Sequence, residues 1–344
     1  MSNPYVGKGW TTRLFAATQP KYAFRARTKE EFDAWQRAFR AELVEVLGLP
    51  RIESRGASQN PPQKVGEVEM AGYREEKWVL ETEPGFFVPF YLLVPHGLTG
   101  PVPLVIAVHG HSPQGKEIYA GHYQSDEDRE SGETQERNIG IQAVQEGYVA
   151  LVPDMRAFGE LQNPEEMRGR GFCRTLQMHA QLLGRTLVGE RVWDVMRLLD
   201  YALTRPEVDG ERVIITGNSG GGTVSLFAAA VDPRITLAAP GSYFCTFQSS
   251  IAAVFHCECN YIPGIVTLGE MYDVAGLIAP RPFLAINGRE DRIFPLEGAQ
   301  EAFRKLKEIY RVAGAEKRCE LYIGEGGHRY YKARIWSFVK EWLG

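Results

Sequence analysis

The sequence lacks the features of a secreted, membrane-spanning or polyanion-binding protein. Its 344 residues contain five cysteines, a low and odd number that is typical of reduced thiols rather than of a disulfide framework. No apolar run approaches the roughly 18–20 residues that cross a bilayer, and the start Met1-Ser2-Asn3-Pro4-Tyr5 lacks the pattern of a secretory signal. Lys and Arg total 39 against 43 Asp and Glu, which does not favour a nucleic-acid partner. We therefore expect a cytoplasmic protein that binds neither membranes nor nucleic acids.

What the sequence does contain is typical of a globular domain, with 44% hydrophobic and 24% charged residues. Near the N-terminus, Thr28 and Glu31 have the spacing of a capping box and predict the start of a helix. Apolar residues then recur every three or four positions, at Phe32, Trp35, Phe39, Leu43 and Val46. We interpret residues 1–67 as a helical extension, with a polar surface connection over Arg51–Lys64, packed on a main domain of residues 68–344.

From about Val68 onward, short apolar runs alternate with helical patterns. The expected strands are Trp78–Thr82, Phe86–Val94, Pro103–Val108, Tyr148–Val152, Arg212–Thr216, Thr236–Ala239, Arg281–Ile286 and Cys319–Ile323. The expected helices are Gln135–Gln145, Gly189–Leu203, Gly220–Val231, Leu296–Val312 and Lys332–Leu343. This alternation predicts an α/β fold with a mostly parallel central sheet and helices on both faces. In such sheets, ligands bind outside the carboxyl ends of the strands.

One strand–helix junction has the form G-x-S-x-G. Gly217-Asn218-Ser219-Gly220-Gly221 follows a buried strand and opens a helix, which is the context that this motif requires. A sharp turn there would present the Ser219 hydroxyl above the sheet, and Gly217 and Gly221 would avoid clashes where the chain passes itself closely. The turn predicts a nucleophilic serine, with the backbone N–H of Gly220 as a donor to an oxyanion.

A serine hydroxyl needs a base, and the base needs a carboxylate to orient it. Asp291 lies on the loop after the strand Arg281–Ile286, and Glu290 beside it is the competing carboxylate. The alternative for Asp291 is a structural ion pair with a neighbouring arginine. His328 follows the last strand in a glycine-rich loop, and the chain order Ser, Asp, His is the one expected for this kind of turn.

In enzymes whose nucleophile lies on a G-x-S-x-G turn, the loop after an earlier strand supplies a second oxyanion donor. In this sequence that loop begins at His109-Gly110-His111. By position, the backbone N–H of His111 is the candidate. The same loop runs into a G-x-x-x-x-G-K pattern that ends at Lys116. Glu117 stands where a phosphate-binding loop needs Ser or Thr, so we expect no bound nucleotide.

Two other groups of residues invite a functional interpretation. His256-Cys257-Glu258-Cys259 suggests a metal site, with His109 and His111 as further ligands, but C-x-C spacing fits zinc poorly. Packed thiols are the interpretation that we favour, with no metal and no cofactor. Four aromatic residues beyond the strand Thr236–Ala239 are candidates for a small substrate pocket or for ordinary core packing: Tyr243, Phe244, Phe247 and Tyr261.

Together these motifs resemble the α/β-hydrolase superfamily, in particular bacterial esterases described as acetyl-xylan-esterase-like or dienelactone-hydrolase-like. The resemblance is carried by His109–His111, Asp154–Gly159, Gly217–Gly221, Gly288 with Asp291, Cys257–Gly264, and Gly327-His328. It implies the α/β-hydrolase fold and a serine nucleophile at Ser219, with Asp291 and His328 completing a triad. Dienelactone hydrolases carry a cysteine where this chain has Ser219.

We therefore expect a serine carboxylesterase that hydrolyses short-chain, acetyl-type esters of small molecules through an acyl-enzyme intermediate. Two alternatives stay open. One is a peptidase of the prolyl-oligopeptidase type, which shares the triad but usually carries a large gating domain. The other is a non-catalytic α/β-hydrolase scaffold used for binding. No feature of the sequence indicates an oligomeric state.

Overall fold

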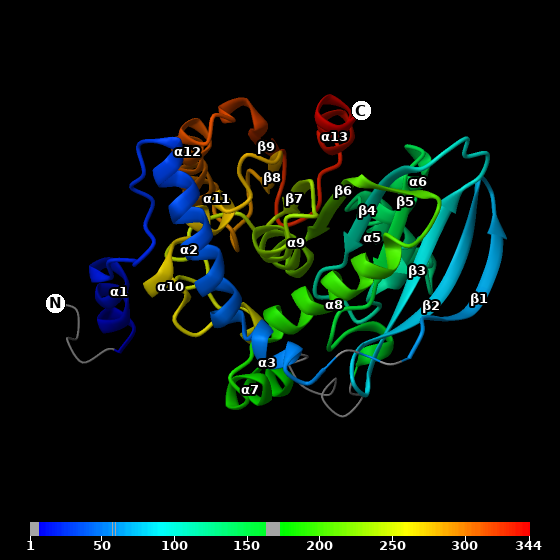
Figure 1. Cartoon of the computed structure of the whole chain (residues 1–344), viewed down its shortest axis with the longest axis horizontal. Coiled ribbons are helices and arrows are strands. Elements are labelled where there is room, and N and C mark those ends of the chain that lie inside the picture. The colour runs from blue at the N-terminus through cyan, green and yellow to red at the C-terminus, as the bar shows by residue number, and fades with distance from the viewer. Residues whose placement is uncertain (1–6, 57, 59, 163–172) are drawn as a thin grey trace.

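The computed structural model describes residues 7–56, 58, 60–162 and 173–344. Within these ranges nine strands form one sheet, in the order β1-β2-β3-β5-β4-β6-β7-β8-β9 (Figure 1). The strands are β1 Gln63–Met70, β2 Tyr73–Glu83, β3 Phe86–Pro95, β4 Val102–Val108, β5 Val149–Pro153, β6 Val208–Asn218, β7 Leu237–Gly241, β8 Phe283–Gly288 and β9 Cys319–Gly324. Strands β1 to β3 are antiparallel and β3 meets β5 antiparallel, whereas β5, β4 and β6 to β9 pair in parallel. The prediction of a mostly parallel sheet is confirmed.

The first strand, β1, differs from the sequence prediction, which placed a surface connection up to Lys64. Seven of its eight residues are exposed, and the last is partly buried. Because this edge strand turns neither face to a core, its apolar residues Val65 and Val68 are more than half exposed and do not mark a buried face. The prediction also missed a short helix, α3 (Leu49–Glu53), which buries Leu49 and Ile52 within and just before the expected connection.

Helices cover both faces of the sheet, as predicted. They are α1 Gly7–Ala17, α2 Lys29–Leu47, α3, α4 Lys116–Tyr119, α5 Asp126–Thr134, α6 Ile139–Gln145, α7 Arg174–Leu182, α8 Leu187–Ala202, α9 Gly220–Val231, α10 Ile265–Leu268, α11 Met271–Gly276, α12 Leu296–Val312 and α13 Ile335–Leu343. Short 3₁₀ turns include η3, Glu258–Asn260. In the described ranges, none of these helices combines the length and the apolar character that a bilayer span requires.

Strand β4 shows how the two layers arise from the sequence. Leu104, Ile106 and Val108 point into one core, which also contains residues of α2, α8, α9, α11 and α12. Val105 and Ala107 point to the other face, into a core shared with α6 and α13. Since successive side chains of a strand alternate between faces, a continuous apolar run is buried on both sides. Figure 1 shows α8 and α9 in front of the central strands.

Helix α2 begins and ends as the sequence predicts. Thr28 and Glu31 form the capping box, and Gly48 ends the helix with a φ of 81°. Its apolar face joins the main core, and its polar residues reach the same neighbours. Arg40 donates to the carbonyl oxygens of Ala230 and Leu277, at 2.9 and 2.6 Å. The N-terminal segment therefore packs directly on α9, the helix that follows Ser219.

Candidate active site

Ser219 occupies a strained turn between β6 and α9. Its φ is 56° and its ψ is −113°, a region that residues other than glycine rarely adopt. A Cβ atom on Gly217 or on Gly221 would lie 2.0 Å from the carbonyl oxygen of Val108. The two glycines therefore lie tightly against the end of β4, and the turn between them presents Ser219 outside the carboxyl edge of the sheet.

Asp291 and His328 lie together on the loops that follow β8 and β9. Oδ2 of Asp291 is 2.8 Å from Nδ1 of His328. The other carboxylate oxygen accepts hydrogen bonds from the backbone N–H groups of Ile293 and Phe294, at 2.8 and 3.0 Å. The Phe294 ring stacks on the His328 imidazole, with centroids 5.8 Å apart. These contacts fix the orientation of both the carboxylate and the imidazole.

The alternatives for Asp291 are placed elsewhere. Glu290 has an exposed side chain, and its backbone N–H donates to Gly326. Arg289 forms a bidentate ion pair with Glu325, at 2.7 Å for each bond. Asp291 is buried, so its carboxylate faces the imidazole rather than an arginine.

Ser219 and His328 line the same pocket, which has a volume of about 270 Å³. The other lining residues are Gly110, His111, Ser112, Tyr119, Gln135, Arg137 and Asn218. Sequence reasoning missed Gln135 and Arg137 because it placed both in a helix over Gln135–Gln145. The helix starts later, at Ile139, since Glu136 adopts a left-handed φ of 54°. The turn thereby brings polar side chains to the pocket.

The four aromatic candidates do not line this pocket. Tyr243, Phe244 and Phe247 are buried in the main core, where the Phe244 ring packs on Phe283 with centroids 5.3 Å apart. Phe247 and Tyr261 line a different cavity of about 250 Å³, next to α10. A larger cavity of about 770 Å³, beside Trp78 and Trp193, contains none of the candidate catalytic residues.

The loop after β4 lies against the serine turn. A Cβ atom on Gly110 would lie 2.8 Å from the carbonyl oxygen of Asn218, and one on Gly220 would lie 2.5 Å from Nδ1 of His111. The chain thus approaches itself closely on both sides of Ser219. Of the two predicted oxyanion donors, His111 lines the pocket, and Gly220 lies next to the His111 ring.

Lys116 and His109 have structural partners. The Lys116 ammonium is buried and bonds Asp154 at 2.7 Å and Glu160 at 2.5 Å, so it belongs to an ion-pair network rather than to a phosphate-binding loop. Nε2 of His109 accepts the backbone N–H of Met155 at 2.9 Å, and burial lowers the pKa of this imidazole to about 3. Both residues join the loop after β4 to the loop after β5.

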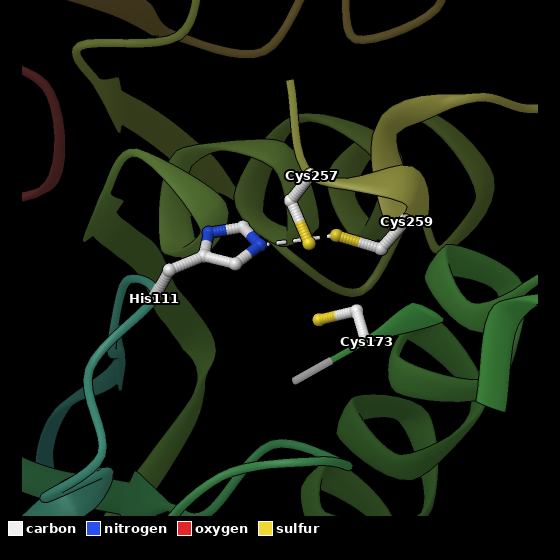
Figure 2. A group of neighbouring side chains, drawn as sticks. All are labelled: His111, Cys173, Cys257 and Cys259. Atoms are coloured by element: carbon white, nitrogen blue, oxygen red, sulfur yellow. Dashed lines mark hydrogen bonds between the residues drawn. The ribbon is translucent and has the colours of Figure 1, made fainter. Parts of the chain in front are cut away.

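The cysteines form a different group from the one that the sequence suggested. Nε2 of His111 and the Sγ atoms of Cys173, Cys257 and Cys259 all lie within 4.8 Å of one another (Figure 2). His256 stands apart from this group and contacts Ser250 at 3.0 Å. Cys173 was not considered because it is 84 positions from Cys257 in the chain. A search for soft ligands irrespective of spacing would have included it.

Comparison with known proteins agrees with this architecture. Residues 5–322 match the Abhydrolase family. The chain belongs to that family. The Bacillus subtilis (strain 168) family relative named "Putative hydrolase YtaP" is 25% identical over 264 residues, which cover 74% of this chain and 83% of that protein.

Solved structures share the fold of this Abhydrolase family member at low sequence identity. A Bacteroides fragilis NCTC 9343 protein named as a putative acetyl xylan esterase superposes with a TM-score of 0.76 at 20% identity, covering 94% of this chain and 82% of that one. For the methylesterase BT1017 the TM-score is 0.69 at 20% identity, with 98% and 67% covered. For a glucuronoyl esterase from Solibacter usitatus it is 0.65 at 13% identity, with 96% and 100% covered. The predicted α/β-hydrolase fold is confirmed.

Proposed function

We propose that this Abhydrolase family member is a serine esterase that hydrolyses short-chain, acetyl-type esters through a covalent acyl-enzyme. The observation that carries the proposal is the arrangement at one pocket: a serine on a strained turn, and an imidazole oriented by a buried carboxylate. Ser219 and His328 line that pocket together, and Asp291 holds Nδ1 of His328 at 2.8 Å. A neutral imidazole that donates from Nδ1 keeps Nε2 as a proton acceptor.

The reaction would proceed in two steps. Nε2 of His328 accepts the proton of Ser219 as Oγ attacks the ester carbonyl, and the alcohol leaves with that proton. Water then attacks the acyl-serine with His328 again as the base, which releases the acid and restores the serine. The backbone N–H groups of Gly220 and His111 would stabilise the oxyanion in both steps, each contributing roughly 3–4 kcal/mol.

The pocket supports a small acyl group joined to a polar alcohol. Its volume is about 270 Å³, which leaves little room for a long acyl chain. Gln135, Arg137 and Asn218 supply hydrogen-bonding groups, and Tyr119 supplies an aromatic wall. The name of one solved structure with this fold, a putative acetyl xylan esterase, is consistent with an acetyl group joined to a carbohydrate-like alcohol.

Covalent labelling tests the nucleophile. A fluorophosphonate probe should label the wild-type chain, and p-nitrophenyl acetate should be hydrolysed; Ser219→Ala should lose both activities while keeping its thermal transition. Ser225→Ala is the matched control, since its hydroxyl is buried in α9 and bonds the carbonyl of Gly221 at 2.7 Å. Labelling that persists in Ser219→Ala would overturn the assignment.

A panel of further substrates, tested beside the probe, separates the two alternatives. A peptidase of the prolyl-oligopeptidase type would cleave an aminoacyl-prolyl amide in preference to acetyl esters. A non-catalytic scaffold would fold normally but react with neither the probe nor any ester. We expect hydrolysis of acetyl esters to exceed amide cleavage, and acetyl and butyryl esters to be turned over faster than long-chain esters.

A further inference from the structure

Four soft ligand atoms converge beside the pocket. Nε2 of His111 lies 3.1 Å from Sγ of Cys259, and the thiols of Cys173 and Cys257 complete a group whose atoms are all within 4.8 Å of one another. Figure 2 shows the imidazole and the three thiols directed toward one another from separate parts of the chain. His111 follows β4, Cys173 immediately precedes α7, and the other two cysteines lie at η3.

The donor set is the one that zinc prefers. Three thiolates and one imidazole form a Cys₃His set, and a tetrahedral zinc site with Zn–S of about 2.3 Å and Zn–N of about 2.0 Å places neighbouring ligand atoms roughly 3.5–3.8 Å apart. The cluster is close to that size. All five cysteines are free thiols, and Cys173 and Cys259 are buried. No described residue supplies a further ligand to this group, so the four donors form a closed set.

A buried arginine beside the cluster has the positive charge that would balance a negatively charged metal–thiolate centre. Nη2 of Arg191 donates to Sγ of Cys173 at 3.1 Å and to the carbonyl oxygen of Arg156 at 2.7 Å. Among the described residues, no carboxylate forms an ion pair with it, although its side chain is almost fully buried. A buried cation needs a counter-charge, and neutral thiols would not provide one. Three thiolates with Zn²⁺ carry a net charge of −1, which Arg191 would balance.

The contact between Arg191 and Cys173 also has the geometry of a hydrogen bond to a metal ligand. Nη2 of Arg191 lies 3.1 Å from Sγ of Cys173. Thiolate, rather than thiol, is the form that binds a metal ion. Hydrogen bonds from an outer shell also orient metal ligands, and the Arg191 contact has that form.

We propose that His111, Cys173, Cys257 and Cys259 bind one Zn²⁺ in a closed, structural site. The sequence interpretation favoured packed thiols because it considered only two sulfur ligands, in C-x-C spacing, beside the histidines. Cys173 supplies the third sulfur from a distant segment. With all four positions filled by the protein, the ion has no place for a water molecule, and its role is to hold the three segments together. It would do so by joining the loop after β4 to α7 and η3.

The position of the site gives it a consequence for catalysis. The ring of His111 lies against Gly220, where a Cβ atom would come within 2.5 Å of Nδ1. Ligation through Nε2 would fix this ring and therefore the backbone of His111 at the wall of the pocket. This second part of the inference rests on the proposed function, in which that backbone N–H is an oxyanion donor. The metal site itself does not depend on it.

Metal analysis of the full-length chain tests the proposal directly. Elemental analysis should find about one zinc per wild-type chain, and less than half as much in Cys173→Ser and in Cys259→Ser. Cys245→Ser and Cys319→Ser are matched controls, since these buried thiols lie outside the cluster and contact the carbonyls of Pro295 and Glu316. Their zinc content should equal that of the wild type. A zinc-free wild-type chain, or loss of zinc in the control variants alone, would overturn the site.

Spectroscopy keeps the test decisive if a ligand variant does not fold. Wild-type chain stripped of metal with a chelator and loaded with Co²⁺ should show the intense visible bands of a tetrahedral cobalt ion and the charge-transfer absorption of cobalt–thiolate bonds. Absence of these bands in folded protein would contradict a Cys₃His site. So would a mass lower by two hydrogen atoms in non-reduced protein, which would show that two of the thiols form a disulfide instead.

The effect of the zinc site on catalysis is measured separately from the zinc content. Ser219→Ala should keep its zinc, because its hydroxyl is not a ligand. Chelation should lower kcat for p-nitrophenyl acetate by about 100-fold, the size of effect expected when one oxyanion donor is displaced, and added zinc should restore it. Bound zinc in a chain that no fluorophosphonate labels would refute the esterase while supporting the site; labelling without zinc would do the reverse.

Discussion

Nδ1 of His328 lies 2.8 Å from Oδ2 of Asp291, although 37 positions separate the two residues in the chain. The pairing of β8 with β9 explains this proximity. These parallel strands end side by side at Gly288 and Gly324, so the loops that follow them leave the sheet at the same edge. The relationship between carboxylate and imidazole is therefore a consequence of sheet topology and not of local sequence.

Replacing Asp291 by asparagine should slow ester hydrolysis strongly. The amide cannot stabilise the imidazolium, and an NH₂ group facing Nδ1 would favour the tautomer whose Nε2 carries the proton. In a serine protease triad, the same change lowers kcat about 10⁴-fold, and we expect a loss of 10³–10⁴-fold in kcat for p-nitrophenyl acetate. Steady-state kinetics with unchanged circular dichroism would establish it.

Glu290→Gln is the matched control for that prediction. Glu290 is adjacent in sequence and its side chain is exposed, so its replacement should leave kcat within about two-fold of the wild type. The assignment of the carboxylate would be wrong if Glu290→Gln were the slow variant and Asp291→Asn the active one.

Much of the fold and of the candidate site could be predicted because each depends on local patterns. Strands β4, β5, β7 and β8 are short, buried and nearly all apolar, which separates them clearly from the helices. The turn at Ser219 is marked by glycines that its close contacts require, and Gly217 and Gly221 have no room for a side chain. Asp291 and His328 were predicted from their positions after late strands, because the loops that follow parallel strands leave the sheet at the same edge.

The residues that escaped prediction are those brought together by distant segments. Arg137 reaches the pocket because Glu136 adopts a left-handed backbone conformation. The periodicity of apolar residues does not predict such a conformation. Cys173 is 84 positions from Cys257 in the chain, and it meets Cys257 and Cys259 where α7 packs against η3. Edge strand β1 was missed for a different reason: with both faces open to solvent, its sequence carries no pattern of burial.

The glycine at position 217 should be intolerant of even one methyl group. A Cβ atom there would lie 2.0 Å from the carbonyl oxygen of Val108, which is backbone and cannot move aside cheaply. Gly217→Ala should lower the free energy of unfolding by about 1–3 kcal/mol, or more if the turn cannot relax, as measured by denaturant titration. Gly100→Ala serves as the control, because a Cβ atom at Gly100 meets nothing within 4 Å. Equal stability of the two variants would contradict a close-packed turn.

Arg137 should discriminate between substrates by their alcohol part. Its side chain lines the pocket with Ser219 and also donates to Ser131 at 2.8 Å. A hydrogen bond from a charged donor contributes about 1.5–3 kcal/mol, so Arg137→Met should lower kcat/KM for acetylated sugars by roughly 10- to 100-fold. For p-nitrophenyl acetate, whose leaving group offers no hydroxyl, the loss should be smaller. Arg129→Met, on the exposed face of α5, is the control; a uniform loss on all substrates for Arg137→Met would argue against a role in recognition.

His122 should make the stability of the protein depend on pH above neutrality. Its two ring nitrogens lie 2.8 Å from Glu117 and 3.0 Å from Glu75, and the hydrogen bonds to these carboxylates raise the pKa of His122 to about 9. Because the folded-state pKa lies above the ordinary value of about 6.5, the contribution to stability is fully present below pH ~6.5 and is lost as pH rises toward 9. The side chain is partly exposed, so solvent screening limits the effect to the order of 1 kcal/mol. Denaturant titrations should show the difference in unfolding free energy between wild type and His122→Gln shrinking across that window; a constant difference from pH 6 to pH 9 would refute a charged imidazole held between the two carboxylates.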